Sequence, residues 1–231
     1  TGDANTVLGS SAGANITTGT QNVAVGASAL DDNTTASYNT AVGNQALDAN
    51  TTGINNVFVG HQAGKNQTTA SQNVAVGQKA LYTSETTSGH TAIGFTALYS
   101  NTSGTGNSAL GYQTLYNNTS GYANTALGYR AMYQNTEGLD NTAVGETALE
   151  NNTTGDNNVA IGRQALDTNT TGNYNTAVGR SALVVNSTAN DNTAIGALTL
   201  ASNTTGTDNV AVGMQALTGN TTGNYNTALG N

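Results

Sequence analysis

A short repeat with a period of seventeen runs through the chain without insertion or deletion, and no other feature restricts the possible fold as much. Its 14 copies begin at Asn5 and then at every seventeenth residue as far as Asn226, with His90 replacing Asn in one copy. Gly stands four residues after every start, and the residue before that Gly is always Val, Ile or Leu. Because low-complexity disorder does not hold such a register, the repeat predicts one folded repeat domain over residues 1–231.

Each copy is numbered here from its Asn, which is position 1. Position 2 is Thr, Ser or Val, position 3 is almost always Ala, position 4 is the aliphatic residue and position 5 is the Gly. Position 8 is Ala or Thr, position 9 is usually Leu, and positions 12 to 15 usually read Asn-Thr-Thr-Gly. Positions 6, 7, 10, 11, 16 and 17 vary between copies and carry nearly all the charged residues. We therefore expect their side chains on the outside of the fold.

The residue types of the repeat disfavour a helix, because every copy contains Gly and is rich in Asn and Thr. The segment "NTAV" alternates with period two, as a short strand does, and "NTTG" is a turn signature in which Gly accepts a positive φ. We therefore expect an all-β fold, a parallel β-solenoid (β-roll) of about 14 coils. Each coil is predicted to contain a strand at positions 1 to 5, a bend at Gly, a second extended piece at positions 7 to 10, and a return through NTTG.

Stacked coils place equivalent residues about 4.8 Å apart, so identical side chains form ladders. We expect the position 1 Asn side chains to hydrogen-bond from coil to coil, and the position 4 aliphatics and position 9 Leu to form the core. Ala at position 3 then points away from the core. We expect this row to contact neighbouring chains of a homotrimeric rod, through Ala24, Ala41, Ala75, Ala143 and Ala160. The alternative is a monomeric solenoid in which small residues permit tight coils.

The composition argues against several functions. The net charge is −8 and the chain has only five Lys and Arg, too few to neutralise a row of phosphates, so nucleic acid is not an expected partner. Cysteine is absent, which excludes a disulfide scaffold and a thiolate metal site. No apolar run is long enough to span a bilayer, so membrane insertion is not expected. Thr1 is not a natural start, and we expect the chain to be a piece of a longer protein.

The titratable residues do not form a recognisable catalytic or metal-binding pattern. His61 and His90 stand at positions 6 and 1 of coils two apart, and His90 is predicted to replace one Asn of its ladder. No Ser-His-Asp set, phosphate loop or zinc spacing occurs, so we expect no enzyme activity, no cofactor and no metal. Asp140, Asp191 and Asp208 share position 17, but only the last two lie in adjacent coils, and Ca²⁺ requires six to eight oxygens.

Aromatic residues gather in consecutive copies in the middle of the chain. They occupy position 10 in four copies and position 6 in three of the same copies: Tyr82, Tyr99, Tyr116 and Tyr133, and Phe95, Tyr112 and Tyr129. Clustered exposed aromatics are typical of a surface that binds a glycan or receptor. Ring stacking that only stabilises the solenoid explains the same pattern, and we favour stacking.

Two copies carry a resemblance to known repeats. The segments "NSALGYQTLYNNTSGYA" from Asn107 and "NTALGYRAMYQNTEGLD" from Asn124 resemble those of bacterial and phage tail-fibre-domain proteins. The "NVAVG" segments are similar to the "SVAIG" strand of trimeric autotransporter adhesin heads, whose coils are usually shorter than this repeat. This resemblance implies a trimeric left-handed β-roll. It leads us to expect a non-enzymatic shaft or spacer of a tail fibre or cell-surface adhesin, located extracellularly, at a cell surface or on a virion, and contacting itself and a host-surface glycan or receptor.

Two other functions fit the repeat. Regular Thr rows on a flat solenoid face match ice spacing in ice-binding proteins, but such faces need paired outward Thr, and position 2 often changes to Val. The second alternative is a subunit of an extracellular filament, joined end to end through open strand edges.

Overall fold

The computed structural model describes residues 2–231 and shows an all-β parallel β-solenoid with the 17-residue repeat, which confirms the predicted architecture, with about 13 turns where about 14 were expected. No helix occurs in that range. The chain divides into two compact units. The first contains residues 2–113 with Asn118–Ser120, and the second contains Thr114–Asn117 with Gly121–Asn231.

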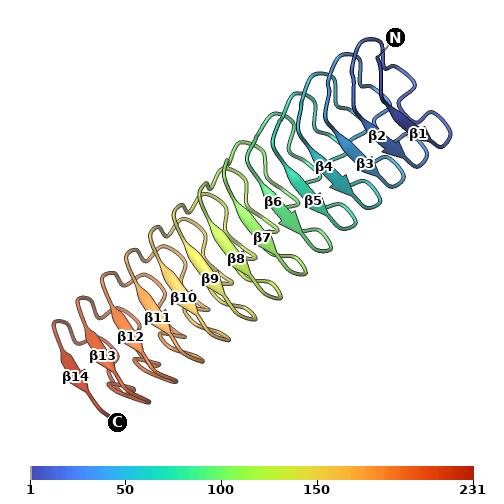
Figure 1. Ribbon diagram of the computed structural model, residues 1–231. Helices are drawn as coiled ribbons and strands as arrows, with labels where there is room; N and C mark the ends of the chain where they lie inside the picture. Colours follow the sequence, from blue (N-terminus) through green and yellow to red (C-terminus); the bar gives the residue numbers. More distant parts are fainter. Residues whose placement is uncertain (1) are drawn as a thin grey trace. The chain divides into compact units, whose positions relative to one another are not determined.

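Every repeat contributes one strand of three residues, which covers positions 2 to 4 (Figure 1). The strands of the first unit are β1 (Thr6–Leu8), β2 (Val23–Val25), β3 (Thr40–Val42), β4 (Val57–Val59), β5 (Val74–Val76), β6 (Thr91–Ile93) and β7 (Ser108–Leu110). Those of the second unit are β8 (Thr125–Leu127), β9 (Thr142–Val144), β10 (Val159–Ile161), β11 (Thr176–Val178), β12 (Thr193–Ile195), β13 (Val210–Val212) and β14 (Thr227–Leu229).

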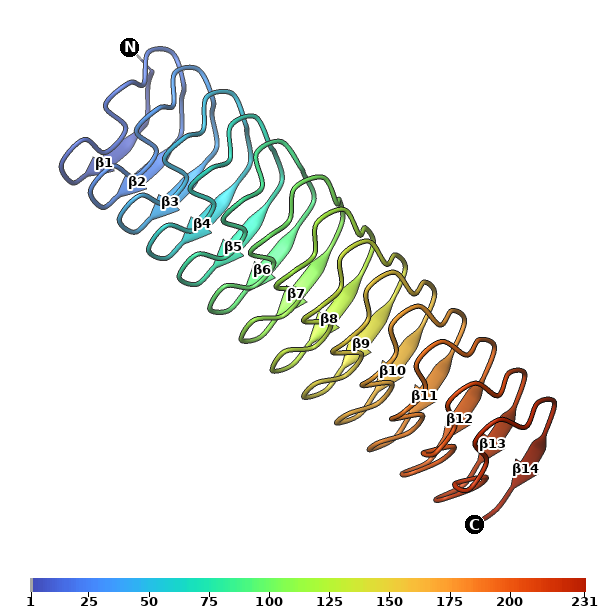
Figure 2. The ribbon, with the colours of Figure 1, turned by 180° about the vertical axis from the view of Figure 1, so that it is seen from behind.

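Within each unit the strands pair in parallel and in chain order, and each residue faces its equivalent in the next coil. In the second unit, for example, Ala160 of β10 is opposite Ala177 of β11, and Ile161 is opposite Val178. Seen from behind, each strand forms one wall of its coil and the rest of the repeat loops back to the next strand (Figure 2). One copy of the repeat therefore corresponds to one coil.

Gly at position 5 ends each strand because no other residue fits there. Gly145 has a φ of +136°, and a Cβ on it would lie 2.7 Å from the carbonyl carbon of Gly162 in the next coil. Side chains are excluded both by this backbone conformation and by the close approach of the next coil. The bend predicted at this Gly is thus confirmed.

The remainder of the coil differs from the prediction, because positions 7 to 10 form turns instead of a second extended piece. Residues at positions 7, 9 and 17 have a positive φ, as Leu149 does at 52° and Asn157 at 56°. The Gly of "NTTG", such as Gly155, does not lie in that region, so the reason given for its presence was wrong. A Cβ there would meet the Gly172 carbonyl oxygen at 2.5 Å, so close contact between coils favours Gly.

Hydrogen bonds between coils continue through these turns. The Leu149 N–H donates to the Ala165 carbonyl at 2.9 Å, and the Thr153 N–H donates to the Thr170 carbonyl at 2.9 Å. Position 13 adds a side-chain bond, since the Thr153 hydroxyl donates to the same Thr170 carbonyl at 2.9 Å. The neighbouring coil therefore satisfies backbone polar groups of the turns.

The core contains the position 3 Ala, the position 8 Ala and the position 9 Leu, while the position 4 side chains point outward. Two predictions were therefore wrong: position 4 is not core, and position 3 does not form a surface between chains. All five of the Ala residues expected at that surface are fully buried inside their own coils: Ala24, Ala41, Ala75, Ala143 and Ala160. The predicted alternation of the strand was right, but its two faces were exchanged.

The reason for this orientation is the space left by position 9. In the coil that begins at Asn56, position 9 is Gly64 and position 3 is Phe58, which is fully buried. A Cβ on Gly64 would lie 2.1 Å from a ring carbon of Phe58, so the ring occupies the volume that Leu fills in other coils. Leu at position 9 therefore leaves room only for Ala at position 3, in agreement with close packing of protein interiors.

The Asn residues of position 1 form the predicted buried ladder. Asn158 donates from Nδ2 to Asn141 Oδ1 at 3.1 Å and to the Gly172 carbonyl at 2.8 Å, and its backbone N–H also donates to Asn141 Oδ1. Its own Oδ1 accepts from the N–H of Asn175 at 3.0 Å. Each amide thus joins three successive coils, which confirms the ladder.

A second ladder, at position 12, was not predicted because the segment was interpreted as a turn. Asn152 is fully buried and donates from Nδ2 to Asn135 Oδ1 at 2.7 Å and to the Gly155 carbonyl at 2.9 Å. The Gly155 carbonyl also accepts from Asn141 of the first ladder at 2.8 Å. The two ladders therefore share the carbonyl of position 15, and they are a large part of the polar interior.

Candidate functional site

The outward strand face is the surface formed by positions 2 and 4 within each unit. Its side chains are Thr, Val or Ser at position 2 and Val, Ile or Leu at position 4, with no charged residue in any copy. Several are well exposed, among them Ile161 at 39% and Ile195 at 41% in the second unit and Leu110 at 45% in the first. In each unit this face is a row of apolar and hydroxyl side chains on parallel strands.

The charged residues lie on other parts of the coil, as predicted from the variable positions. No Lys, Arg, Asp or Glu occurs at positions 1 to 5 in any copy. Repeating apolar surface without a charge is unusual for a solvated face and is typical of a surface that is covered by a partner. The outward strand face is therefore the strongest candidate for an interaction surface.

The predicted aromatic stacking is present in both units. In the first unit the rings of Tyr82 and Tyr99 stack with centroids 5.2 Å apart and planes 2° from parallel, and Phe95 stacks on Tyr112 at 5.3 Å. In the second unit Tyr116 and Tyr133 stack at 5.3 Å, and Tyr129, half exposed, occupies position 6. Cations lie over some rings: Lys79 over Tyr82 at 5.4 Å and Arg130 over Tyr133 at 4.2 Å.

Stacking affects what these aromatic residues can bind. Two rings that stack in parallel cover one face of each other, so that face is closed to a ligand. Recognition of a sugar by an aromatic platform requires an open ring face, and the cations over Tyr82 and Tyr133 occupy further ring faces. The geometry therefore supports the structural interpretation of these residues, as stabilising contacts between coils.

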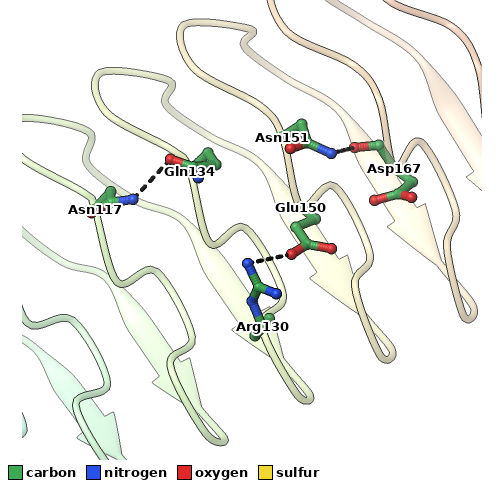
Figure 3. A network of polar contacts seen from close by, with 6 residues as sticks. All are labelled: Asn117, Arg130, Gln134, Glu150, Asn151 and Asp167. Atoms are coloured by element: carbon green, nitrogen blue, oxygen red, sulfur yellow. Dashed lines mark hydrogen bonds and ion pairs between the residues drawn. The ribbon is translucent and has the colours of Figure 1, made fainter.

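A polar network lies on the second unit where charged residues replace the Tyr of position 10 (Figure 3). Arg130 forms an ion pair of 2.8 Å with Glu150, and Asn151 donates from Nδ2 to the backbone carbonyl of Asp167 at 3.0 Å. Burial is the main cause that raises the pKa of Asp167 to about 6; the nearby Glu150 raises it further and Arg130 opposes this. Burial thus favours the neutral form of the Asp167 carboxyl. The stability that this group contributes is greatest at pH values below its ordinary pKa of 3.8, and it is lost as the pH rises through about 6.

His90 lies in the position 1 ladder of the first unit, as predicted, and it is 1% exposed. Its Nδ1 accepts a hydrogen bond from the Asn107 N–H at 3.2 Å, so that nitrogen carries no proton. Nε2 lies 3.1 Å from the Thr87 hydroxyl, which stands where other coils have Gly or Ala. Thr87 also accepts from Asn101 at 3.0 Å and contacts Ser84, which replaces the Asn of position 12. The three departures from the repeat at Ser84, Thr87 and His90 thus compensate for one another.

Burial lowers the pKa of His90 from its usual 6.5 to about 4, because the charged form would lose water. Since the folded pKa lies below the unfolded one, this site stabilises the fold fully above pH 6.5, and that stability is lost as the pH falls toward 4. A difference of this size corresponds to roughly 3 kcal/mol at about 1.4 kcal/mol per pH unit.

We expect His90→Asn to remove this acid sensitivity, because an amide does not titrate and restores the side chain of every other copy. Chemical denaturation at a series of pH values between 7 and 4 measures the effect, with local opening followed by hydrogen exchange in the first unit. The matched control is His61→Asn, since His61 is exposed at position 6. Equal acid sensitivity in wild type and His90→Asn contradicts the prediction.

Other possible sites are not assembled in the described part of the chain. Within residues 2–231, no three His, Cys, Asp or Glu side chains are grouped so that they could hold a metal ion. Asp140, Asp191 and Asp208 have a positive φ at position 17, where their backbones take part in the turns. The described residues also include no helix that is long and apolar enough to cross a membrane.

The fold and its surfaces define a class: the chain is a parallel β-solenoid with a 17-residue repeat, two buried Asn ladders and a charge-free outward strand face. No family model, no curated protein and no solved structure matches it.

Proposed function

We propose that the chain is a non-enzymatic structural shaft or spacer of a tail fibre or cell-surface adhesin, which assembles as a homotrimer and acts outside the cell or on a virion. The observation that carries this proposal is the outward strand face. It has an aliphatic residue at position 4 and no charged residue in all 14 copies, while positions 6, 7, 10, 11, 16 and 17 vary and carry most of the charge. Such a face is stable in water when copies of the chain cover it, and burial of each aliphatic side chain contributes about 1.5 to 3 kcal/mol.

This proposal assigns the contact between chains to position 4 instead of position 3. Ile161 and Ile195 of the second unit are then buried by the other chains, with the side chains of position 2 at the margin. Coil-to-coil hydrogen bonds supply a stiff scaffold, and the variable positions decorate its outside. Contact of the aromatic residues with a host glycan is a lesser part of the proposal, because their stacked faces are covered. A glycan array with wild type and a Tyr99→Ala, Tyr116→Ala double variant tests that part.

The test of assembly is the mass in solution, measured by light scattering. We expect wild type to have the mass of three chains and the Ile161→Lys, Ile195→Lys double variant to have the mass of one, with an unchanged circular dichroism spectrum. The control is Val185→Lys with Met214→Lys. These apolar residues are also exposed, at 38% and 56%, but they lie off the outward strand face. A monomeric wild type, or a trimeric Ile161→Lys, Ile195→Lys variant, contradicts the proposal, and a mass that grows with concentration favours a filament.

An ice-binding protein is the second candidate, and the same face favours it. Position 2 supplies outward Thr residues on successive strands, such as Thr176 and Thr193, beside aliphatic residues. The position 13 hydroxyls are engaged within the solenoid, as Thr153 shows, so a Thr row at that position is less suited to ice. Thermal hysteresis of the wild-type protein, abolished by the Ile161→Lys, Ile195→Lys variant, supports ice binding over assembly.

A further inference from the structure

The Asn ladder at position 12 coincides with an acceptor sequence for N-linked glycosylation. The transferase of the eukaryotic secretory pathway modifies Asn in Asn-x-Ser/Thr, where x is not Pro. Nine of the Asn residues at position 12 meet this requirement: Asn33, Asn50, Asn101, Asn118, Asn152, Asn169, Asn186, Asn203 and Asn220. The Asn residues at position 1 never do, because position 3 is not Ser or Thr in any copy.

The folded ladder has no room for a glycan. Eight of the nine side chains are fully buried, and the ninth, Asn220, is partly buried. Both N–H groups of the Asn152 amide are used, one on Asn135 Oδ1 and one on the Gly155 carbonyl. The next rung repeats this arrangement, with Asn169 donating to Asn152 Oδ1 at 2.9 Å and to the Gly172 carbonyl at 3.0 Å.

Glycosylation changes the donor capacity as well as the size of this side chain. The amide nitrogen attacks the sugar C1 of a lipid-linked oligosaccharide diphosphate. The N–C bond forms, the C1–O bond to phosphate breaks, the lipid diphosphate leaves, and the amide loses one proton. One of the two ladder bonds is thereby lost, and a bulky polar chain is attached inside the coil.

We infer that N-linked glycosylation at position 12 blocks the folding of this chain, so that the protein must be synthesised where this transferase does not act. The transferase reaches chains before they fold, when burial does not yet protect the ladder. Synthesis in a bacterial cytosol avoids the modification entirely. This inference is independent of whether the protein is a shaft, a filament or an ice-binding protein.

A second set of acceptor sequences, one residue earlier, provides an internal comparison. The Asn residues at position 11 of four copies also precede x-Thr, namely Asn15, Asn66, Asn117 and Asn151. None of them is fully buried, and Asn15 is exposed. A glycan at position 11 can extend into solvent, so these sites report that the transferase has acted without blocking the fold.

The experiment expresses the chain with a secretory signal peptide in yeast and compares it with a variant that lacks only the position 12 acceptors. The variant replaces the exposed Ser or Thr at position 14 of those copies by Ala: Thr35, Thr52, Ser103, Ser120, Thr154, Thr171, Thr188, Thr205 and Thr222. The ladder and all four position 11 acceptors remain. Both chains are first produced in bacterial cytosol, where circular dichroism and protease resistance establish that each one folds.

We expect wild type to carry glycans at position 12, mapped by mass spectrometry, and to yield at least tenfold less secreted, protease-resistant protein than the variant. The variant should be secreted and folded with glycans at position 11 only. Two outcomes overturn the inference. One is secreted, protease-resistant wild type with glycans on position 12, and the other is wild type secreted as well as the variant with position 12 unmodified.

Discussion

Ala177→Lys is expected to unfold the coils around β11, whereas the same substitution at the next residue, Val178, should be tolerated. Ala177 is fully buried between Ala160 and Ala194 of the adjacent strands. A larger side chain overpacks this space at a cost of about 1 to 3 kcal/mol, and an unpaired buried charge adds several kcal/mol. Each coil of a solenoid is stabilised by its neighbours, so the neighbouring coils should open as well.

The matched control is Val178→Lys, one residue further along the same strand. Val178 points to the outward strand face and is only partly buried, so the same charge there should leave the fold intact and alter association. Limited proteolysis with mass mapping detects cleavage near residue 177, and circular dichroism reports the loss of structure. A folded Ala177→Lys protein contradicts the inward orientation of position 3.

Asn158→Ala should destabilise the second unit by about 2 to 6 kcal/mol, because it leaves two buried N–H donors unpaired at a cost of about 1 to 3 kcal/mol each. These donors are the backbone N–H of Asn175 and one N–H of its Nδ2, which both bond to Asn158 Oδ1. Asn141 Oδ1 and the Gly172 carbonyl also lose the Nδ2 donor of Asn158. Urea denaturation measures the change in the free energy of unfolding.

Asn151→Ala is the control for this variant, because it removes the same side chain from a partly buried position with one hydrogen bond, to the Asp167 carbonyl. We expect a loss of less than about 1 kcal/mol there. Similar losses in the two variants would mean that the ladder has no special role in stability.

The period, the parallel coils, the bend at Gly and the position 1 ladder could all be predicted from the sequence. Each of them depends on the constant spacing of seventeen residues, which places equivalent residues of adjacent coils next to one another. Stacking of Tyr82 on Tyr99 followed from the same reasoning. His90 in the ladder did too, because it occupies the same register as the Asn residues.

The orientation of the strand could not be predicted from hydrophobicity alone. Val is more apolar than Ala, which favours Val inside, but the volume of Leu at position 9 and the two Asn ladders leave room only for Ala. A signal for this was present in the sequence: Gly replaces Leu at position 9 only in the two copies in which position 3 is larger than Ala. These pairs are Val7 with Gly13 and Phe58 with Gly64, and such compensation requires that the two positions touch.

The second ladder was missed for a different reason. Asn-Thr-Thr-Gly is a common turn composition, and propensity does not distinguish a turn exposed to solvent from one whose Asn is buried. Only the hydrogen bonds of Asn152 to another coil make that distinction.

The positive φ of ordinary residues at positions 7, 9 and 17 has a consequence for how the molecule forms. Leu149 and its equivalents at position 9 adopt a conformation that costs about 1 to 2 kcal/mol per residue and that an isolated repeat does not adopt. The hydrogen bonds that offset this cost come from the adjacent coil, as Leu149 makes one to Ala165. Folding is therefore expected to follow nucleation and propagation. A nucleus of several coils forms slowly, and each further repeat then folds rapidly by pairing with the coil that is already formed.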